Sequence, residues 1–253
     1  MGYYPRFLPL CVVTDHSGPN FNPFPYDYEC ENKGKDFLTH TRLKAISFKE
    51  KTGQNGYIIQ NPFEWYYKKN SRYFNKIIPE YETFFPVHHL PSDQDELFDL
   101  EKSLSSVLER VNDRTKFRIC LHKHDIDRGL HVKYINAGYN VTTAGNSLDD
   151  NFVDRFLFIL FSSKSVLANH IGSIAFYSAL FDKKFIYVKD EYHNWESPFE
   201  EEVALKLSND SKTWNKEMKH SLVSKIYDYN LVISRLKLSL VLYRNLFKLF
   251  WVR

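Results

Sequence analysis

Four short groups of polar residues and glycines stand out in the second part of the chain because each directly follows an apolar segment. They are residues 86–89 (PVHH), 122–125 (HKHD), 144–146 (AGN) and 169–173 (NHIGS). If the apolar segments are strands of one parallel sheet, these groups meet at its carboxyl edge. Doubly wound folds bind their ligands at that edge. The spacing therefore predicts one site built from all four groups.

The group at residues 169–173 carries the most specific signal. Gly172 and Ser173 open a predicted helix, whose N–H groups and dipole attract a phosphate. Gly172 lets the backbone approach a ligand closely, and Ser173 adds a hydroxyl donor. An ordinary helix start with Asn169 or Ser173 as N-cap explains the same residues equally well. Neither GxGxxG nor GxxxxGK[ST] occurs, which disfavours dinucleotide and P-loop binding.

The histidines that follow the first two segments are candidates for contact with an anion. His88 and His122 are placed to donate hydrogen bonds to a phosphate, where a positive charge would stabilise the leaving group. Lys123 and Arg128 are alternatives for that role. A zinc site built from the histidines of these two groups lacks the tight ligand spacing of zinc proteins, so no metal is expected.

A second candidate lies near the start of the chain, where residues 15–18 (DHSG) follow another apolar segment. A carboxylate or imidazole at a strand end can act as the general base on an acceptor hydroxyl. Asp15 and His16 are therefore the candidate catalytic residues. A turn organised by the Asp15 side chain, with Gly18 at the bend, is an equally good interpretation.

The elements that must position these groups alternate regularly between strand and helix. Strands are predicted at residues 82–87, 116–121, 139–143, 165–168 and 184–188, and helices at 93–112, 127–137, 149–161 and 172–181. This alternation predicts right-handed βαβ units and a doubly wound parallel sheet. The fold class is therefore α/β.

The rest of the chain is predicted to form two further parts. Residues 1–72 contain two short strands, 10–14 and 57–60, and a helix at 36–49, which is too little for a complete Rossmann-like domain. Residues 73–210 form the doubly wound domain, and residues 211–253 are helical. The end of this last part is basic and aromatic, which suits a membrane surface. Packing against another domain explains it equally well.

Composition excludes several classes of protein. Hydrophobic residues make up 43% of the chain, which predicts a folded protein, and the net charge of +3 argues against a nucleic-acid binder. The 3 cysteines show no disulfide or zinc spacing, so we expect a reduced, cytoplasmic protein. We identify neither a signal peptide nor an apolar stretch long enough to span a bilayer.

The order of these motifs resembles a known family. HSG after the first strand, IIQNPF, FFPVHH, LHKHD and the run from YINAG to FIYV together cover about residues 10–190. This pattern is similar to bacterial GT-B glycosyltransferases of surface polysaccharide synthesis, and loosely to sialyltransferases and Kdo transferases. The resemblance implies a GT-B-like fold with a shortened N-terminal part on the acceptor side and a Rossmann-like nucleotide-sugar-binding domain.

The resemblance also implies an activity. It is the metal-independent transfer of a sugar from a nucleotide-sugar, with CMP-sugars as one donor class, to a polysaccharide or lipid-linked acceptor of the kind found in lipopolysaccharide or capsule. No cofactor is needed, and the enzyme would work in the cytoplasm or on the inner face of the membrane. A non-catalytic binding relative, a sugar-nucleotide epimerase and a simple phosphate-binding module remain alternatives.

Roles for single residues follow from the resemblance. Asp15 or His16 would be the acceptor-side base, and His88 would contact the donor phosphate. Asn169, Gly172 and Ser173 would hold that phosphate at the helix start, while Asp125 and Gly145 would lie near the base or ribose. The chain departs from the family in three ways. Pro86 precedes His88 instead of following it, the acidic triplet before a glycine is absent, and the first domain is short.

Overall fold

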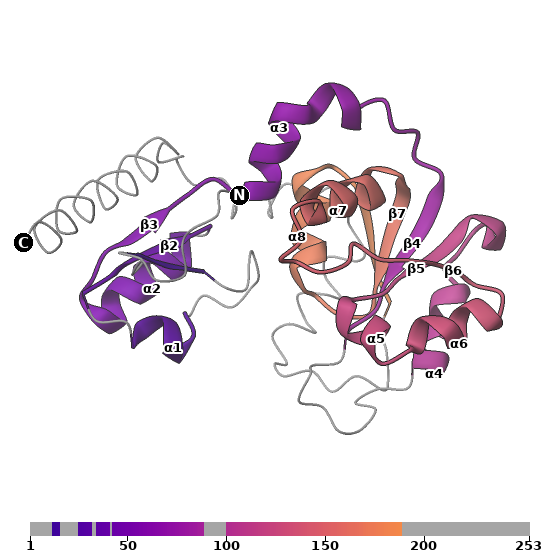
Figure 1. Cartoon of the computed structure of the whole chain (residues 1–253), viewed down its shortest axis with the longest axis horizontal. Coiled ribbons are helices and arrows are strands. Elements are labelled where there is room, and N and C mark those ends of the chain that lie inside the picture. The colour runs from indigo at the N-terminus through magenta and orange to yellow at the C-terminus, as the bar shows by residue number, and fades with distance from the viewer. Residues whose placement is uncertain (1–11, 16–24, 32–33, 41, 89–99, 189–253) are drawn as a thin grey trace, which may run out of the picture. The chain divides into compact units, whose positions relative to one another are not determined.

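The computed structural model describes residues 12–15, 25–31, 34–40, 42–88 and 100–188 of the chain. These residues belong to two compact units (Figure 1). The N-terminal unit comprises the described residues up to Pro62, and the C-terminal unit begins at Phe63. The division therefore falls at the start of a helix that the sequence had not predicted.

The N-terminal unit is built on a three-stranded parallel sheet in the order β1-β2-β3. Its elements are β1 (Val12–Thr14), α1 (Asp27–Cys30), β2 (Asp36–Thr39), α2 (Arg42–Thr52) and β3 (Gly56–Ile58). The central strand β2 is the most buried, and the Phe37 ring stacks on Phe48 of α2 at 4.6 Å between centroids. Helix α2 thus covers the sheet through an aromatic pair.

The prediction of one helix over residues 36–49 was wrong at its first turn. Residues 36–39 (DFLT) form the central strand β2, and only the later residues enter α2. A strand that is buried on both faces shows a continuous apolar run instead of alternation. Such a run cannot be distinguished from a buried helix by periodicity alone. The neighbouring strands, which decide the matter, are visible only in the tertiary structure.

Gly56 marks the place where α2 crosses closest to β3. A Cβ atom at this position would lie 2.5 Å from the Ala45 carbonyl oxygen and 2.6 Å from the Ala45 Cα. Backbone atoms cannot move aside as a flexible side chain can. We expect Gly56→Ala to destabilise the N-terminal unit by about 1–3 kcal/mol, the usual cost of overpacking.

Hydrogen exchange of the β2 amides would measure this cost, because it reports the stability of one unit separately from the other. Glu50→Ala, on the exposed face of α2, is the matched control and should leave the exchange of those amides nearly unchanged. If Gly56→Ala behaves like the control, the close crossing is not present in solution.

The C-terminal unit contains a five-stranded, wholly parallel sheet in the order β6-β5-β4-β7-β8. Its strands are β4 (Tyr81–Phe85), β5 (Phe117–Cys120), β6 (Asn140–Thr142), β7 (Ser163–Ala168) and β8 (Lys184–Tyr187). The chain starts in the middle at β4, builds outward to β6, and then crosses over to β7 and β8. This order is that of a doubly wound sheet, and it confirms the predicted fold class.

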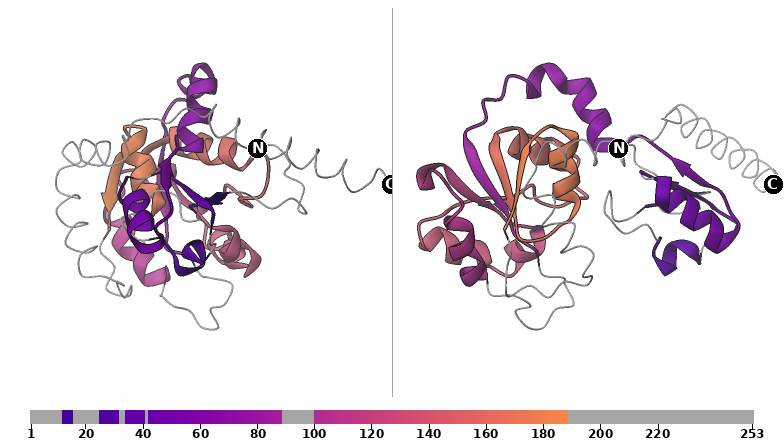
Figure 2. Two further views of the ribbon diagram at one scale, coloured as in Figure 1. Left: turned by 90° about the vertical axis from the view of Figure 1, so that its left-hand side faces the viewer. Right: turned by 180° about the vertical axis from the view of Figure 1, so that it is seen from behind.

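Helices cover both faces of this sheet (Figures 1 and 2). They are α3 (Pro62–Phe74), α4 (Leu100–Leu108), α5 (Lys123–Asp127), α6 (Leu130–Asn136), α7 (Phe152–Phe161) and α8 (Ser173–Leu180), with a 3₁₀ turn at Arg114–Lys116. On one face, Leu104 and Val107 of α4 and Tyr134 of α6 pack with Phe84 and Ile119 of the sheet. Burial of these apolar side chains is the main force that holds this layer in place.

The opposite face is aromatic. Phe63 of α3 contacts Phe156 of α7 edge-on, with ring centroids 5.1 Å apart, and Tyr177 of α8 at 4.5 Å. Tyr67 of α3 stacks on Phe161 of α7 at 5.0 Å. Aromatic pairs in these geometries add stability beyond their buried area. The high aromatic content of the chain is therefore used, at least in part, to pack α3 onto the sheet.

Several sequence-based boundaries are corrected by the structure. The predicted helix at 127–137 is two helices, α5 and α6, because Gly129 adopts a left-handed conformation with φ of 79°. Of the helix predicted at 93–112, residues 93–99 lie outside the described residues, and α4 ends at Leu108 instead of Asn112. The segment at 211–253 lies outside them. Among the residues that the structure describes, no helix is both long and apolar enough to cross a membrane.

Candidate functional site

The candidate site lies where the order of the C-terminal sheet reverses, between β4 and β7. These two strands pair in parallel, with Phe85 opposite Ala168 near their carboxyl ends. Beyond the pairing, the Val87 N–H donates a hydrogen bond of 2.8 Å to Oδ1 of Asn169. The side-chain amide thereby joins the segment after β4, which carries His88, to the segment after β7.

Asn169 is fully buried, so it has a different place from the one predicted. The resemblance implied that Asn169 contacts the donor phosphate at the helix start. In the structure its Oδ1 accepts the Val87 N–H instead, which fixes the backbone just before His88. A buried amide with a satisfied acceptor acts as a brace between loops. Asn169 therefore positions the site without facing a ligand itself.

Three imidazoles gather beside this brace, and we call His88, His122 and His124 the histidine cluster. The His88 and His122 rings stack with 4.1 Å between centroids and 26° between planes. The His124 ring lies 4.7 Å from His122 and 6.3 Å from His88. Because β4 and β5 are neighbours, the segments that follow them bring these side chains together. The sequence correctly placed two of these histidines at adjacent strand ends.

His122 also begins helix α5. Its backbone is extended, and its Nδ1 accepts a hydrogen bond of 3.3 Å from the His124 N–H. A nitrogen that accepts a hydrogen bond carries no proton. The neutral ring therefore holds its proton on Nε2, which is the nitrogen left to donate to a ligand.

The surroundings of His122 favour its neutral form. Burial, followed by the positive charge of protonated His88 and His124, lowers the pKa of His122 to about 4. Asp125 acts in the opposite direction, and Lys123 reinforces the lowering. The sequence suggested a positive charge at His122, but in the free protein the ring is neutral at pH 7. An uncharged imidazole can still donate one hydrogen bond to a phosphate oxygen.

Asp125 lies beneath the cluster. Its residue is only 1% exposed, on the short helix α5. The resemblance implied that this residue lies near the base or ribose of a nucleotide. The structure places its carboxylate instead inside the protein, where it counters the positive potential on His122. Its influence on a ligand is therefore exerted through the histidines.

Helix α8 starts on the other side of the brace. Its N-cap is Gly172, and among the described residues no side chain caps it and no acidic residue lies in its first turn. The positive end of the helix dipole is thus not neutralised locally. A Cβ at Gly172 would lie 2.7 Å from Nε2 of His170, so only glycine leaves room for that ring. Gly172 and Ser173 keep the arrangement expected of an anion-binding helix start.

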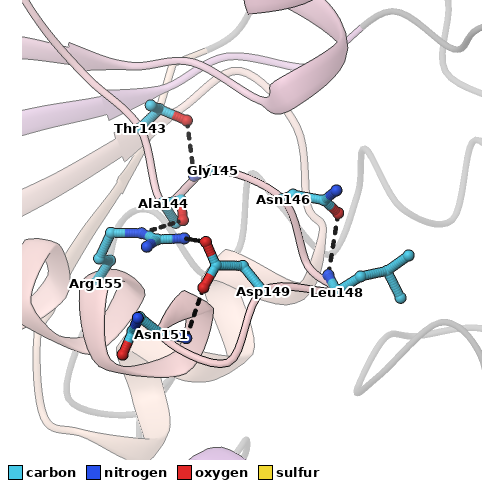
Figure 3. A network of polar contacts seen from close by, with 8 residues as sticks. All are labelled: Thr143, Ala144, Gly145, Asn146, Leu148, Asp149, Asn151 and Arg155. Carbon is cyan, nitrogen blue, oxygen red and sulfur yellow. Dashed lines mark hydrogen bonds and ion pairs between the residues drawn. The ribbon is translucent and has the colours of Figure 1, made fainter.

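The segment after β6 forms a stiff loop at the same edge of the sheet (Figure 3). Gly145 adopts φ of 80°, and its N–H donates to Oγ1 of Thr143 at 3.0 Å. Arg155 of α7 donates through Nε to the Ala144 carbonyl at 2.8 Å and through Nη2 to Asp149 at 3.0 Å. The guanidinium therefore clamps both ends of the loop.

The remaining contacts close this loop on itself. Asp149 Oδ1 accepts the Asn151 N–H at 2.8 Å, and Asn146 Oδ1 accepts the Leu148 N–H at 3.0 Å (Figure 3). The Leu148 side chain is 89% exposed at its tip. Sequence reasoning identified Gly145, but it missed Arg155. Nothing in the residue spacing distinguishes that arginine from an ordinary surface charge.

The candidate catalytic carboxylate of the N-terminal unit is not exposed. Asp15 Oδ1 lies 2.8 Å from Lys44 Nζ, and the two side chains are 0% and 1% exposed. Its Oδ2 accepts a hydrogen bond of 2.7 Å from Thr39 Oγ1. Both oxygens are therefore engaged inside the unit, and the turn with Gly18 at its bend lies outside the described residues. His16 lies outside the described residues.

His40 lies at the carboxyl end of β2 in the same unit. Burial lowers its pKa, although Asp15 and a hydrogen bond with the Ile59 backbone partly oppose this effect. Its Nδ1 is buried without a partner among the described residues. The ring is therefore held neutral beside the Asp15–Lys44 pair. The sequence analysis did not single out this histidine.

The described residues contain no group of three or more His, Cys, Asp or Glu side chains that could hold a metal ion. In the histidine cluster the His88 and His122 rings are stacked, whereas the His124 ring is tilted relative to both. His89, the fourth histidine of the zinc alternative, lies outside the described residues. The arrangement offers hydrogen-bond donors for an anion.

Comparisons with known proteins give only distant likenesses. No family model matches the chain, and no curated protein matches its sequence. Solved structures with a related backbone include S. aureus MnaA bound to UDP, with 14% identity, a TM-score of 0.47 and coverage of 83% of this chain and 63% of that one. The wall teichoic acid polymerase TagF has 10% identity, a TM-score of 0.45 and coverage of 95% and 66%. The chain thus spans slightly less than two thirds of each, and neither likeness assigns it to a family.

Proposed function

We propose that this chain binds a nucleotide-sugar at the carboxyl edge of its C-terminal sheet and transfers the sugar to a polysaccharide or lipid-linked acceptor. One observation carries the proposal. The histidine cluster and the uncapped start of α8 lie on either side of the Asn169 brace, where the strand order reverses. Doubly wound proteins bind nucleotides at this position.

The donor phosphates would be held by two kinds of group. The first-turn N–H groups of α8 and the Ser173 hydroxyl supply donors on the β7 side. His88 and the Nε2–H of His122 supply donors on the β4 and β5 side. Charge that develops on the leaving phosphate would be stabilised by these fixed donors, which need little reorganisation. This chemistry needs no metal ion among the groups named.

The nucleoside would extend toward the loop after β6. That loop lies at the same edge of the sheet, and the Arg155 clamp holds it in one shape. In this proposal Gly145 would lie near the base or ribose, as the resemblance implied. A preorganised loop lowers the conformational entropy that binding must otherwise overcome.

The burial of Asp15 in the N-terminal unit favours a second candidate function. Asp15 would have to leave Lys44 and Thr39 before it could accept a proton, so His16 is the remaining proposed base. A non-catalytic relative that binds a nucleotide-sugar without turning it over would need no base at all. The buried Asp15–Lys44 pair is the observation in favour of this alternative.

Binding is tested first. Thermal-shift titrations with CMP-, UDP- and GDP-sugars should raise the melting temperature with at least one donor. With that donor, His88→Ala and Ser173→Ala should each weaken binding by about tenfold or more, because each removes a hydrogen bond to a charged group. His131→Ala and Ser105→Ala, on α6 and α4, are the matched controls. The site is elsewhere if both site variants match the wild type.

Turnover then separates the two functions. Hydrolysis or transfer of the bound sugar, followed by product analysis, identifies an enzyme. His16→Ala should abolish that turnover while leaving nucleotide-sugar binding intact. Binding without any turnover, and without an effect of His16→Ala, identifies the non-catalytic relative.

A further inference from the structure

We infer that the histidine cluster takes up a proton when the donor phosphate binds, so that the chain binds its nucleotide-sugar more tightly in mildly acidic than in mildly alkaline solution. This inference rests on the proposed function, because it concerns the same site. It adds that pH regulates the binding of the nucleotide-sugar, which recognition of the phosphate does not by itself require.

The geometry of the cluster is the first argument. Three titratable rings lie with their centroids between 4.1 and 6.3 Å apart, and two of them are stacked. A proton on one ring raises the electrostatic energy of a proton on either neighbour. The three rings therefore titrate as one coupled group, and the first proton is the one that matters near neutral pH.

The charges around the cluster are the second argument. On α5, Lys123 is paired with Asp127, while Asp125 lies buried beneath the rings and Arg128 ends the helix. On the β7 side the titratable group His170 lies next to Gly172. In the free protein, burial and the charges of His88 and His124 outweigh Asp125 and lower the pKa of His122 to about 4, which keeps that ring neutral.

A bound phosphate reverses this balance. Its negative charge stabilises the protonated form of an imidazole within hydrogen-bond reach, so the pKa of the cluster rises on binding. Thermodynamic linkage then requires the converse, namely that protonation of the cluster strengthens phosphate binding. If one proton is taken up, affinity increases by about tenfold for each unit by which the pH falls between the pKa of the ligand-bound cluster and the lower pKa of the free cluster.

Protonation of His122 has an energetic cost at the start of α5. Protonation of its Nδ1 removes the acceptor of the His124 N–H at the start of α5. His122→Asn separates the two roles, because asparagine is a good N-cap but does not titrate. This variant should keep α5 intact and lose the part of the pH dependence that His122 contributes.

The experiment uses the full chain and two probes whose phosphates are fully esterified, UDP-glucose and a CMP-sugar. Such phosphates lack the ionisation near pH 6 of a terminal phosphate, so any proton taken up belongs to the protein. Calorimetric titrations between pH 6 and 8, in buffers of different ionisation enthalpy, count the protons. NMR titration of the histidine ring protons identifies the residue that gains them.

The expected result has three parts. Affinity for at least one probe rises by several-fold to about tenfold per pH unit as the pH falls. The pKa of one cluster histidine rises on binding, and His122→Asn flattens the pH dependence. His131→Gln, outside the cluster, leaves the pH dependence unchanged.

Two results would overturn the inference. The first leaves the proposed function standing, and the second removes it as well. Binding of a probe at equal affinity across the pH range, with unshifted histidine signals, removes the proton linkage but leaves the proposed function standing. No binding of either probe at any pH, together with no stabilisation by any nucleotide-sugar, removes both.

Discussion

Lys44→Met is expected to destabilise the N-terminal unit by about 3–5 kcal/mol, which is the typical cost of breaking a buried ion pair. The substitution leaves the Asp15 carboxylate in a site where its side chain is 0% exposed. The Thr39 hydroxyl, at 2.7 Å, would then be its one remaining partner among those described above. A single neutral hydrogen bond does not replace a cation at 2.8 Å in such surroundings.

The double variant Asp15→Asn/Lys44→Met provides the control. It removes both charges, while asparagine can still accept the Thr39 hydrogen bond. Replacing a buried pair with neutral groups is often nearly neutral, so the double variant should be more stable than Lys44→Met alone. Hydrogen exchange of the β2 and α2 amides would measure the stability of the N-terminal unit in both variants. Equal stability of Lys44→Met and the wild type would show that the pair is open to solvent.

This measurement also bears on catalysis. If Asp15 were a free base, Asp15→Asn would reduce turnover and leave stability unchanged. The structure leads us to expect instead that Asp15→Asn lowers the stability of the N-terminal unit before it affects turnover. Stability and turnover must therefore be measured on the same variants before any loss of activity is assigned to chemistry.

Glu82→Gln is expected to destabilise the C-terminal unit by about 3 kcal/mol, although the two side chains have the same shape. The Glu82 residue is 4% exposed, and its carboxylate accepts hydrogen bonds from the Asn112 N–H and Nδ2 at 2.7 Å each. It also accepts from the Asp113 N–H at 3.1 Å and from Ser165 Oγ at 3.2 Å. A glutamine would turn an N–H₂ group toward donors, so at least one of these contacts would be lost.

The same carboxylate makes this unit sensitive to acid. Burial alone would raise the pKa of Glu82, but the hydrogen bonds from Asp113, Asn112 and Ser165 outweigh burial and lower it below 4.5. A carboxyl group whose pKa is lower in the folded state stabilises the fold above the pKa of the unfolded chain. That stabilisation is lost as the pH falls from about 4.5 through the lowered value.

Chemical denaturation at pH 7 and at pH 4 tests both the loss of stability in Glu82→Gln and the dependence of that loss on pH. The difference in stability between the wild type and Glu82→Gln should begin to shrink at the lower pH, because Glu82 of the unfolded wild-type chain then takes up protons. Glu80→Gln is the matched control. Its exposed carboxylate lies 3.3 Å from Lys116, and such surface pairs contribute little. A difference that does not change with pH would contradict the role given to the ionised carboxylate.

The sequence alone determined the fold class and the general place of the site. Strands and helices alternate from Tyr81 onward, and the polar groups at His88, His122, Gly145 and Gly172 each follow a strand. Because the carboxyl ends of parallel strands share one edge, their chain positions were enough to bring them together. Such local signals depend on neighbours in the sequence and can be read without knowing the fold.

Contacts between distant residues were decided only by the tertiary structure. Asp15 meets Lys44, Arg155 meets Ala144, and Asn169 meets Val87, and none of these pairs leaves a periodic signal in the chain. A residue's burial and its partner are properties of the packed state, so the sequence could not show that the side chains of Asp15 and Asn169 are buried. Strand β2 was missed for the same reason, since its identity depends on the two strands that flank it.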